Sequence, residues 1–148
     1  MEHEVEDLIR AEIVARVGYI DRRGLPCVVP ITYAYDGRAI FGYGLIGAKI
    51  ENMGASPNVC VEIDRIENAA DWRSVILRGS YERLEGAQAT AAIEQIRTRL
   101  AANAVATGAP LSAGRTFVDR KGGSGIAYRI LISEKRGRRA IPEEYVEA

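Results

Sequence analysis

Histidine is nearly absent from this chain, since the only one among its 148 residues is His3, in a charged N-terminal segment. The sequence therefore excludes three kinds of site in any ordinary form: a Ser-His-Asp arrangement, a Cys-His pair and a His-based metal site. Cysteine is scarce too: Cys27 and Cys60 each sit in an apolar, strand-like run without a CxxC spacing. We predict that both are small buried side chains and not metal ligands, with a disulfide between them as the alternative. No metal site is expected.

Net charge and long apolar runs are also missing. Twenty basic residues balance twenty acidic ones, which removes the whole-chain electrostatic argument for nucleic acid or an anionic membrane. No apolar stretch approaches the ~20 residues of a membrane span, and the N-terminus begins with glutamates instead of a basic and then apolar signal. We therefore expect a cytoplasmic protein, folded as a single domain over residues 1–148, with no nucleic-acid or membrane partner.

Strand-like segments dominate what is present. They alternate apolar and polar residues or are rich in Val, Ile, Thr and Tyr, and short turns such as 21–24 and Asp36-Gly37 separate the early ones. Gly79 interrupts one of them and predicts a bulge or a bend. The expected strands are 17–20, 26–35, 39–43, 59–63, 72–81 and 126–132; amphipathic helices are expected at 4–15 and 87–105, and a short one at 47–55.

The order of these elements predicts a mostly β fold: six antiparallel strands forming a small barrel, with helices outside it. A Rossmann sheet is excluded, because the chain has neither a GxGxxG after its first strand nor helices alternating with parallel strands. The basic cluster in Glu134–Arg139 is interpreted as a solvated end of the chain.

A lysine in an unfavourable place is the strongest functional signal. The segment 41–50 predicts a strand that runs through glycines into a short helix with Lys49 in its first turn. The unpaired N–H groups and the macrodipole there disfavour a cation and favour an anion. Lys49 is thus interpreted as one wall of a phosphate-sized anion site; the alternative is a solvated surface lysine.

Two further features suggest binding surfaces. Pro30 lies within an otherwise good strand, where it removes a ladder donor, so this strand should be open on one side. Such an edge would expose backbone groups of residues 31–33 to a flat heterocycle, or would form a dimer interface. Trp72, followed by Ser74 and Val75, offers an aromatic face and a hydroxyl, although a single tryptophan also suits a core or an interface.

Five ordered segments carry a family resemblance within roughly Arg16–Tyr81: Val17-Gly18-Tyr19-Ile20, residues 24–33, Gly47-Ala48-Lys49-Ile50, residues 58–64, and Trp72-Arg73-Ser74-Val75 with Gly79. This set resembles the pyridoxamine 5′-phosphate oxidase-like FMN-binding split barrels, particularly the small bacterial branch that includes the nitroimidazole-resistance proteins. The resemblance implies a six-stranded antiparallel split β-barrel that binds FMN. It also implies a homodimer with two flavin sites at the subunit interface.

Carried over by position, the resemblance implies three groups of cofactor-binding residues. The isoalloxazine ring would be lined by Pro30, Ile31, Thr32 and Tyr33. The ribityl phosphate would be held by Tyr43, Gly44, Gly47 and Lys49, while Ser74 and Val75 would touch the ring region with Trp72 close by. No catalytic residue is assigned.

Three departures limit what is carried over. Gly42 stands where many nitroimidazole-resistance relatives have a histidine, so that activity is not transferred. Ala48 replaces a second basic residue, and the tail 134–148 does not match the substrate-binding segment of true pyridoxamine phosphate oxidases. Because a flavin brings its own redox chemistry, the leading hypothesis is an FMN-dependent oxidoreductase of a small molecule. The alternative is a non-catalytic barrel that carries or senses deazaflavin, haem or flavin.

Overall fold

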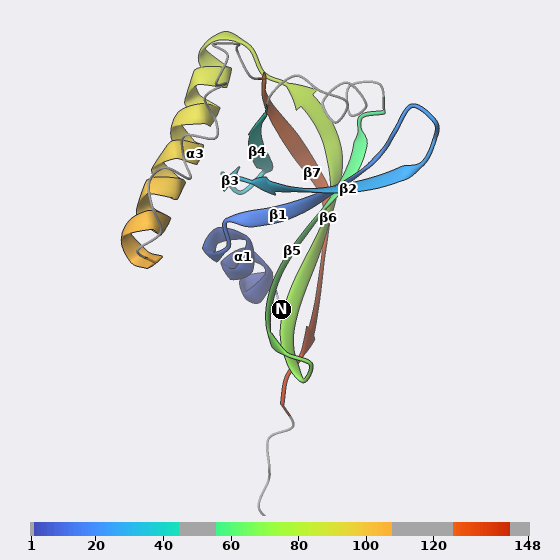
Figure 1. The fold of residues 1–148 in the computed structure, drawn as a ribbon, viewed down its shortest axis with the longest axis vertical. Helices are drawn as coiled ribbons and strands as arrows, with labels where there is room; N and C mark the ends of the chain where they lie inside the picture. Colours follow the sequence, from blue (N-terminus) through green and yellow to red (C-terminus); the bar gives the residue numbers. More distant parts are fainter. Residues whose placement is uncertain (1, 45–55, 108–125, 143–148) are drawn as a thin grey trace, which may run out of the picture.

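The computed structural model describes residues 2–44, 56–107 and 126–142, and every structural statement below refers to them. These residues form two helices and one antiparallel sheet of seven strands (Figure 1). The helices are α1 (Glu2–Ala11) and α3 (Gly86–Thr107). The strands are β1 (Val14–Ile20), β2 (Pro26–Thr32), β3 (Ala34–Tyr35), β4 (Ala39–Gly44), β5 (Asn58–Asn68), β6 (Asp71–Arg83) and β7 (Ile126–Ala140).

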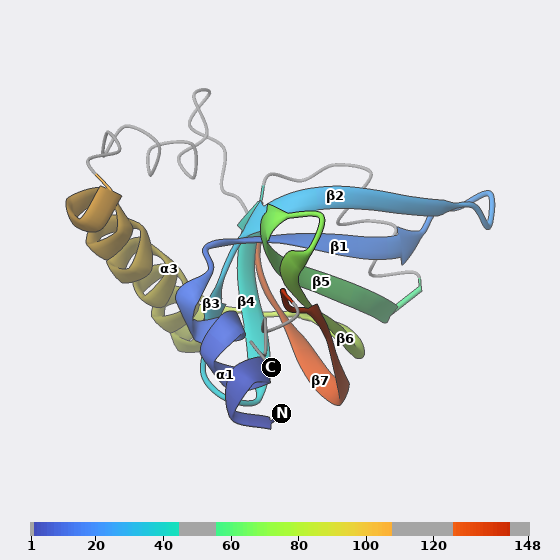
Figure 2. The ribbon, with the colours of Figure 1, turned by 90° about the horizontal axis from the view of Figure 1, so that it is seen from below.

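The sheet curls into a split barrel because its two edge strands are consecutive in the chain. The strand order is β2-β1-β5-β6-β7-β4-β3, and only Tyr33 separates β2 from β3. The predicted strand 26–35 therefore divides at Tyr33: its first part pairs with β1 and its last two residues pair with β4. This division adds a short seventh strand to the six that were expected. Seen from below, the barrel wall curves from β2 round to β4 (Figure 2).

The N-terminal helix is displaced from its predicted range of 4–15. It begins at Glu2 and ends at Ala11, and β1 begins at Val14, earlier than expected. The alternation of β1 explains the difference, because Ala15 and Val17 are both fully buried while Val14 and Arg16 face outward. Val14 and Ala15 thus belong to a strand of the barrel, although their local pattern also suits a helix.

Two turns form as their sequences predict. Gly24 has φ 78° in the β1–β2 turn, and Gly37 has φ 95° between β3 and β4, a region that favours glycine. In each turn an aspartate side chain accepts backbone N–H bonds: Asp21 Oδ1 from Arg23 and Leu25, and Asp36 Oδ1 from Arg38 and Ala39.

Strand β7 is longer than predicted and includes the basic cluster of residues 134–139. Residues 134–139, expected to be a solvated end, are exposed except for Gly137, but they pair with residues 73–78 of β6 and so are part of a strand and not an end of the fold. The side chains alternate between the two faces of the ladder, which gives each face part of the positive charge. The bulge expected at Gly79 is confirmed, since the β6–β7 register shifts between Arg78 and Gly79.

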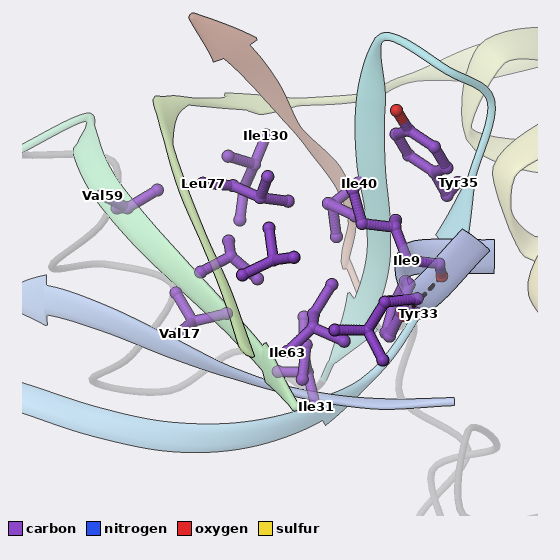
Figure 3. Close-up of a cluster of buried hydrophobic side chains, with 14 of the residues drawn as sticks. Ile9, Val17, Ile31, Tyr33, Tyr35, Ile40, Val59, Ile63, Leu77 and Ile130 are labelled. Carbon is purple, nitrogen blue, oxygen red and sulfur yellow. Dashed lines mark hydrogen bonds between the residues drawn. The ribbon is translucent and has the colours of Figure 1, made fainter. Parts of the chain in front are cut away.

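The barrel interior is the main core. Its buried side chains come from every long strand and from α1, and they include Val17, Ile63, Leu77 and Ile130 (Figure 3). A second, smaller core lies where α3 packs on the outside of β4, between Phe41 and Ile96. Both helices therefore lie on the same side of the molecule, away from the tip of the β1–β2 hairpin (Figures 1 and 2).

The C-terminal end of α1 is held by donors from other elements. The buried Tyr33 hydroxyl donates to the Ile9 carbonyl over 2.6 Å, a contact visible in Figure 3. The Arg99 guanidinium of α3 donates to the Arg10 carbonyl over 2.7 Å and also to the Glu12 carbonyl. These bonds satisfy carbonyls that a helix end leaves unpaired, and the Arg99 cation also suits the negative end of the helix dipole.

The cysteines differ from their predicted burial. Cys60 is exposed because it lies on the outward side of β5, opposite Gly18, whereas Val59 and Val61 point into the barrel. Cys27 is half-buried, and its partner on β1 is Tyr19. Strand β1 lies between the two cysteines and adjacent residues of β1 point to opposite faces, so no disulfide joins them and both are free.

Candidate functional site

The strand that contains Pro30 is open on one side, as predicted. Strand β2 pairs only with β1 and is an edge of the sheet. Pro30 is exposed and Thr32 half-buried, both on the outward side, while Ile31 points into the core. Residues 30–32 are therefore accessible from the edge, which is the property that a backbone clamp for a flat heterocycle requires.

Tyr33 already makes hydrogen bonds within the chain through both its N–H and its hydroxyl. Its N–H donates to the Ile13 carbonyl over 3.1 Å, and its buried hydroxyl holds Ile9. Burial raises the pKa of this phenol far above its usual value, so it stays neutral. Of the predicted ring-binding residues, Tyr33 thus has neither its N–H nor its hydroxyl free for a ligand.

Tyr43 and Gly44 end strand β4 beside the start of β7. Their partners are Ala127 and Ile126. The half-buried Tyr43 side chain packs against the core beneath α3, whereas Gly44 lies on the inward side of the strand. The other two predicted phosphate ligands, Gly47 and Lys49, lie outside the described residues, as does the expected helix 47–55.

The group around Trp72 begins strand β6. Trp72 and Ser74 are half-buried, but the Val75 side chain is 1% exposed and belongs to the barrel core. Ser74 lies opposite Asp64 on one side and Arg138 on the other. Trp72 and Ser74 thus offer side chains to a ligand, whereas the side chain of Val75 is committed to packing.

One chain brings together only part of the predicted site. Pro30 and Ser74 lie on the same outward side of the sheet, separated by three strand spacings, or about 14 Å, across β2, β1, β5 and β6, and by two further residues along the strand. Tyr43 lies beside Ala127 and Ser74 beside Arg138, at opposite ends of β7. The separation is up to about 35 Å along that strand, at ~3.3 Å per residue. A single ligand of flavin size cannot reach both ends within one chain.

Sequence reasoning missed a groove on the outward side of the sheet. It has a volume of about 750 Å³, within the range of roughly 300–1,000 Å³ that is common for ligand sites. Gly18 contributes no side chain to the lining, and a Cβ there would lie 2.7 Å from the Cys60 Sγ. The only sequence signal for this groove was the strand alternation, which places both Gly18 and Cys60 on the outward side. The lining is Gly18, Tyr19, Ile20, Pro26, Cys27, Val28, Asn58, Val59, Cys60, Arg78, Gly79, Ser80 and Ser133.

The groove is chemically suited to a flat, mostly apolar molecule with polar substituents. Apolar walls come from β1 and β2, while Asn58, Arg78 and Ser80 place polar groups on the β5–β6 side. None of the predicted cofactor-binding residues lines the groove. It nevertheless reaches Val28 on β2, two residues before Pro30 on the same side of the strand. The groove and the open edge are therefore continuous.

A charged cluster adjoins the groove on the outward side of the sheet. Arg16 Nη1 lies 3.0 Å from Asp64 Oδ2 and 3.4 Å from Glu62 Oε1. Burial, followed by the neighbouring Asp64 carboxylate, raises the pKa of Glu62 to about 7, and Arg16 only partly opposes this. Glu62 consequently holds a proton more readily than an ordinary exposed carboxyl does.

Two tyrosines with buried hydroxyl groups form another polar feature that the sequence did not reveal. The rings of Tyr81 and Tyr128 lie 5.3 Å apart, and neither buried hydroxyl has a hydrogen-bond partner. The tip of the Tyr128 ring covers Gly42, where a Cβ would lie 2.4 Å from the phenol oxygen. Burial raises the pKa of both phenols. The glycine thus leaves room for a buried tyrosine.

Two kinds of feature are absent from the residues that the structure describes. No group of three or more His, Cys, Asp or Glu side chains is placed to hold a metal ion. Neither α1 nor α3 is long and apolar enough to cross a membrane.

Comparison with known proteins gives a family match over most of the chain. The family model described as pyridoxamine 5′-phosphate oxidase matches residues 1–119. A curated relative, an uncharacterized protein of Rhizobium meliloti (strain 1021), is 32% identical over 85 residues. That match covers 57% of this chain and 56% of the relative, so the chain spans little more than half the length of the curated relative it matches.

Solved structures share the fold across nearly the whole chain. A FAD-binding protein from Mesorhizobium loti is 28% identical with a TM-score of 0.71, and the match covers 95% of each chain. A putative 5-nitroimidazole antibiotic resistance protein from Bacteroides thetaiotaomicron is 20% identical with a TM-score of 0.68, covering 93% of this chain and 82% of that one. A heme-binding protein from Mycobacterium smegmatis is 17% identical with a TM-score of 0.70, covering 91% and 52%.

Proposed function

Because the chain belongs to the pyridoxamine 5′-phosphate oxidase family, we propose that it binds FMN and acts as a flavin-dependent oxidoreductase on a small molecule. The observation that carries this proposal is the open edge of β2 beside a groove of about 750 Å³. The similar protein from Mesorhizobium loti is described as FAD-binding, which supports a flavin as the class of cofactor.

The residues present fit a flavin in two respects. Gly18 presents only backbone to the groove, and the absence of a side chain there suits the close approach of a planar ring system. The accessible edge at residues 30–32 offers backbone groups, which suit the polar rim of such a ring. In the proposed complex, residues 30–32 and the Tyr33 carbonyl bind the ring, and Tyr43, Gly44, Gly47 and Lys49 bind the phosphate.

A second copy of the chain completes the proposed site. Tyr43 and Ser74 lie at opposite ends of β7, so Trp72, Ser74 and the backbone of Val75 would come from the partner in a homodimer. The flavin, when bound, supplies the redox chemistry. The protein contributes binding, orientation of the substrate and exclusion of water, and none of these requires a histidine.

Flavin binding tests this proposal directly. We expect the purified protein to quench FMN fluorescence on titration and to bind riboflavin, which lacks the phosphate, more weakly. Lys49→Ala should weaken FMN binding by about 1.5–3 kcal/mol, the scale of a charge-assisted hydrogen bond, and should leave riboflavin binding unchanged. Arg97→Ala, which removes an exposed cation from α3, is the control and should change neither affinity. Absence of FMN binding would overturn the proposal, and an unchanged FMN affinity in Lys49→Ala would remove Lys49 from the site.

A cofactor-binding barrel without turnover is the second candidate function. It is favoured by the similar structure of a heme-binding protein from Mycobacterium smegmatis, although a likeness at 17% identity extends to the fold alone. The visible absorption spectrum of the protein after incubation with haem or FMN distinguishes the two cofactors. Anaerobic reduction of bound flavin by NADH or NADPH would favour the enzyme, whereas a flavin that neither nucleotide reduces would favour a carrier or sensor.

A further inference from the structure

A row of three arginines crosses the sheet close to the turn between β5 and β6. Arg73 of β6 lies directly opposite Arg65 of β5 on one side and Arg139 of β7 on the other. Directly opposed residues project from the same side of a sheet, and like charges placed there destabilise it. Each of these cations therefore needs a compensating partner.

The two outer arginines of this row have such partners, and the central one does not. Arg65 Nη2 lies 2.7 Å from Glu12 Oε1, just beyond the end of α1. Arg139 Nη1 lies 2.6 Å from Glu4 Oε1 within α1. Among the residues that the structure describes, the Arg73 side chain has no ion pair and no hydrogen bond. The positive charge of the row is thus left uncompensated at its centre.

A hollow of about 200 Å³ opens beside Arg73. Its lining is made of charged residues, and we call it the charged hollow: Arg65, Glu67, Asp71 and Arg73. Glu67 reaches it from a β-bulge, because the β5–β6 register shifts between Ile66 and Asn68 and leaves Glu67 without an opposite residue. A bulge redirects a side chain and is common beside binding sites.

The charges around the hollow face the same space without neutralising one another. Neither the Glu67 nor the Asp71 carboxylate forms an ion pair or a side-chain hydrogen bond within the described ranges, although Arg73 lines the same hollow. Three of the four lining side chains are therefore available to a ligand. Arg65 stays paired with Glu12 and adds only its positive potential.

The balance of charge selects the class of ligand. Two guanidinium groups and two carboxylates line the hollow, so the lining has no net charge. A simple anion attracted by Arg73 is repelled by Glu67 and Asp71, and a simple cation meets the opposite conflict. A small molecule with both a carboxylate and an ammonium group can form charge-assisted hydrogen bonds with both kinds of side chain.

We propose that the charged hollow binds a small zwitterion of the α-amino acid class, with its carboxylate on Arg73 and its ammonium group on Glu67 and Asp71. The lining contains no apolar side chain, so the side chain of the amino acid stays in solvent. Strand alternation places Trp72 and Ser74 on the other side of the sheet. The hollow is therefore separate from the proposed flavin site and does not depend on it.

Calorimetric titration of the FMN-free protein with L-alanine at pH 7 and low ionic strength tests the ligand class. Two matched compounds each lack one charge: N-acetyl-L-alanine has no ammonium group, and L-alaninamide has no carboxylate. We expect each to bind at least about fivefold more weakly than L-alanine, the scale of one partly exposed ion pair. Added salt should weaken L-alanine binding.

Variants of the lining test the place of binding. Arg73→Gln and Glu67→Gln change exposed side chains, and each should weaken L-alanine binding at least about fivefold. Arg73→Gln should leave the binding of L-alaninamide unweakened, because that compound has no carboxylate to pair. Arg138→Gln is the control: it removes an exposed arginine on the other side of β7, opposite Ser74, and should keep the wild-type affinity. An unchanged urea midpoint shows that each variant is folded.

Three outcomes would overturn the inference. Wild-type protein that does not bind L-alanine would remove the site. Equal binding of N-acetyl-L-alanine would make the hollow an anion site, against the assignment of a zwitterion. Binding that survives both Arg73→Gln and Glu67→Gln would place L-alanine elsewhere on the protein. Because FMN is absent from these titrations, failure of the proposed flavin function leaves the test intact.

Discussion

Single residues show how this fold uses hydroxyl groups in two different ways. The Tyr33 hydroxyl is buried and donates to the Ile9 carbonyl at the end of α1, whereas the buried Tyr128 hydroxyl has no partner. The two phenols are among the largest fully buried side chains in the described residues. They therefore form a natural pair for measuring what a buried hydroxyl contributes.

Tyr33→Phe should lower the free energy of unfolding by about 1–3 kcal/mol, because it leaves a buried carbonyl without its donor. Tyr128→Phe is the control and should cost little or raise stability, since it removes a buried hydroxyl that has no partner. Urea unfolding of both variants at the same pH measures the difference. Equal losses in the two variants would show that the bond to Ile9 contributes nothing specific.

Gly42 illustrates how one position constrains another across the sheet. A Cβ at this position would lie 2.4 Å from the Tyr128 phenol, which is fully buried and cannot swing out. Gly42→Ala should therefore destabilise the protein by about 1–3 kcal/mol. Gly18→Ala is the matched control: its Cβ would meet the exposed Cys60 Sγ, which can rotate away, so the loss should be smaller. Thermal or urea unfolding that ranks Gly18→Ala as the more harmful change would contradict this argument.

At the scale of elements, α1 is fastened to the barrel by charges as well as by apolar burial. Glu6 accepts a hydrogen bond from the Tyr35 hydroxyl and one from the Lys135 ammonium of β7. Glu4 accepts one from Arg139 over 2.6 Å. The basic residues of β7 thus have structural partners on α1, a role that their sequence pattern did not reveal.

The pH dependence of stability tests this attachment. Burial alone would raise the pKa of Glu6, but its bonds with Lys135 and Tyr35 outweigh burial and lower that pKa below its usual value. A carboxyl with a lowered pKa contributes stability above its unfolded pKa and loses it as pH falls through the folded one. Wild-type protein should therefore lose more stability between about pH 5.5 and pH 3.5 than Glu6→Gln does. Glu2→Gln, in the exposed first turn, should behave like the wild type in these urea titrations.

At the scale of the whole molecule, one continuous sheet connects the described residues. Its edge strands β2 and β3 are joined through Tyr33, and α1 contributes side chains to the barrel core. Trp72, the only tryptophan, lies at the start of β6, far along the ladder from the core beneath α3. Its fluorescence and the circular dichroism of the whole chain therefore observe different regions.

Unfolding should be a single cooperative transition, because no described element has a core independent of the sheet. Tryptophan fluorescence and far-ultraviolet circular dichroism should give the same urea midpoint. Separate midpoints would show that the α3 side of the molecule unfolds on its own. Added FMN should raise the midpoint of both signals together, since a ligand that binds the folded state stabilises it as a unit.

The amino-acid sequence by itself determined the approximate places of six strands, the two early turns and the helix α3. Alternation in 59–63, the Asp-Gly pair at 36–37 and the glycine at 79 are local signals, and each was confirmed because local sterics decide the outcome. Pro30 marked the sheet edge for the same kind of reason, because proline lacks the N–H donor that a strand with neighbours on both sides requires. The family resemblance on the residues 16–81 was confirmed by a match over 1–119.

Only the tertiary structure decided which of these signals meet in space. The pairing of β6 with the whole of β7 converted a basic tail into a strand, and barrel closure divided the strand 26–35 at Tyr33. It also placed Tyr43 and Ser74 at opposite ends of β7, and brought Gly18 and Cys60 together as the floor of a groove. These are contacts between residues far apart in the chain, and they depend on sheet order and register, which no local pattern encodes.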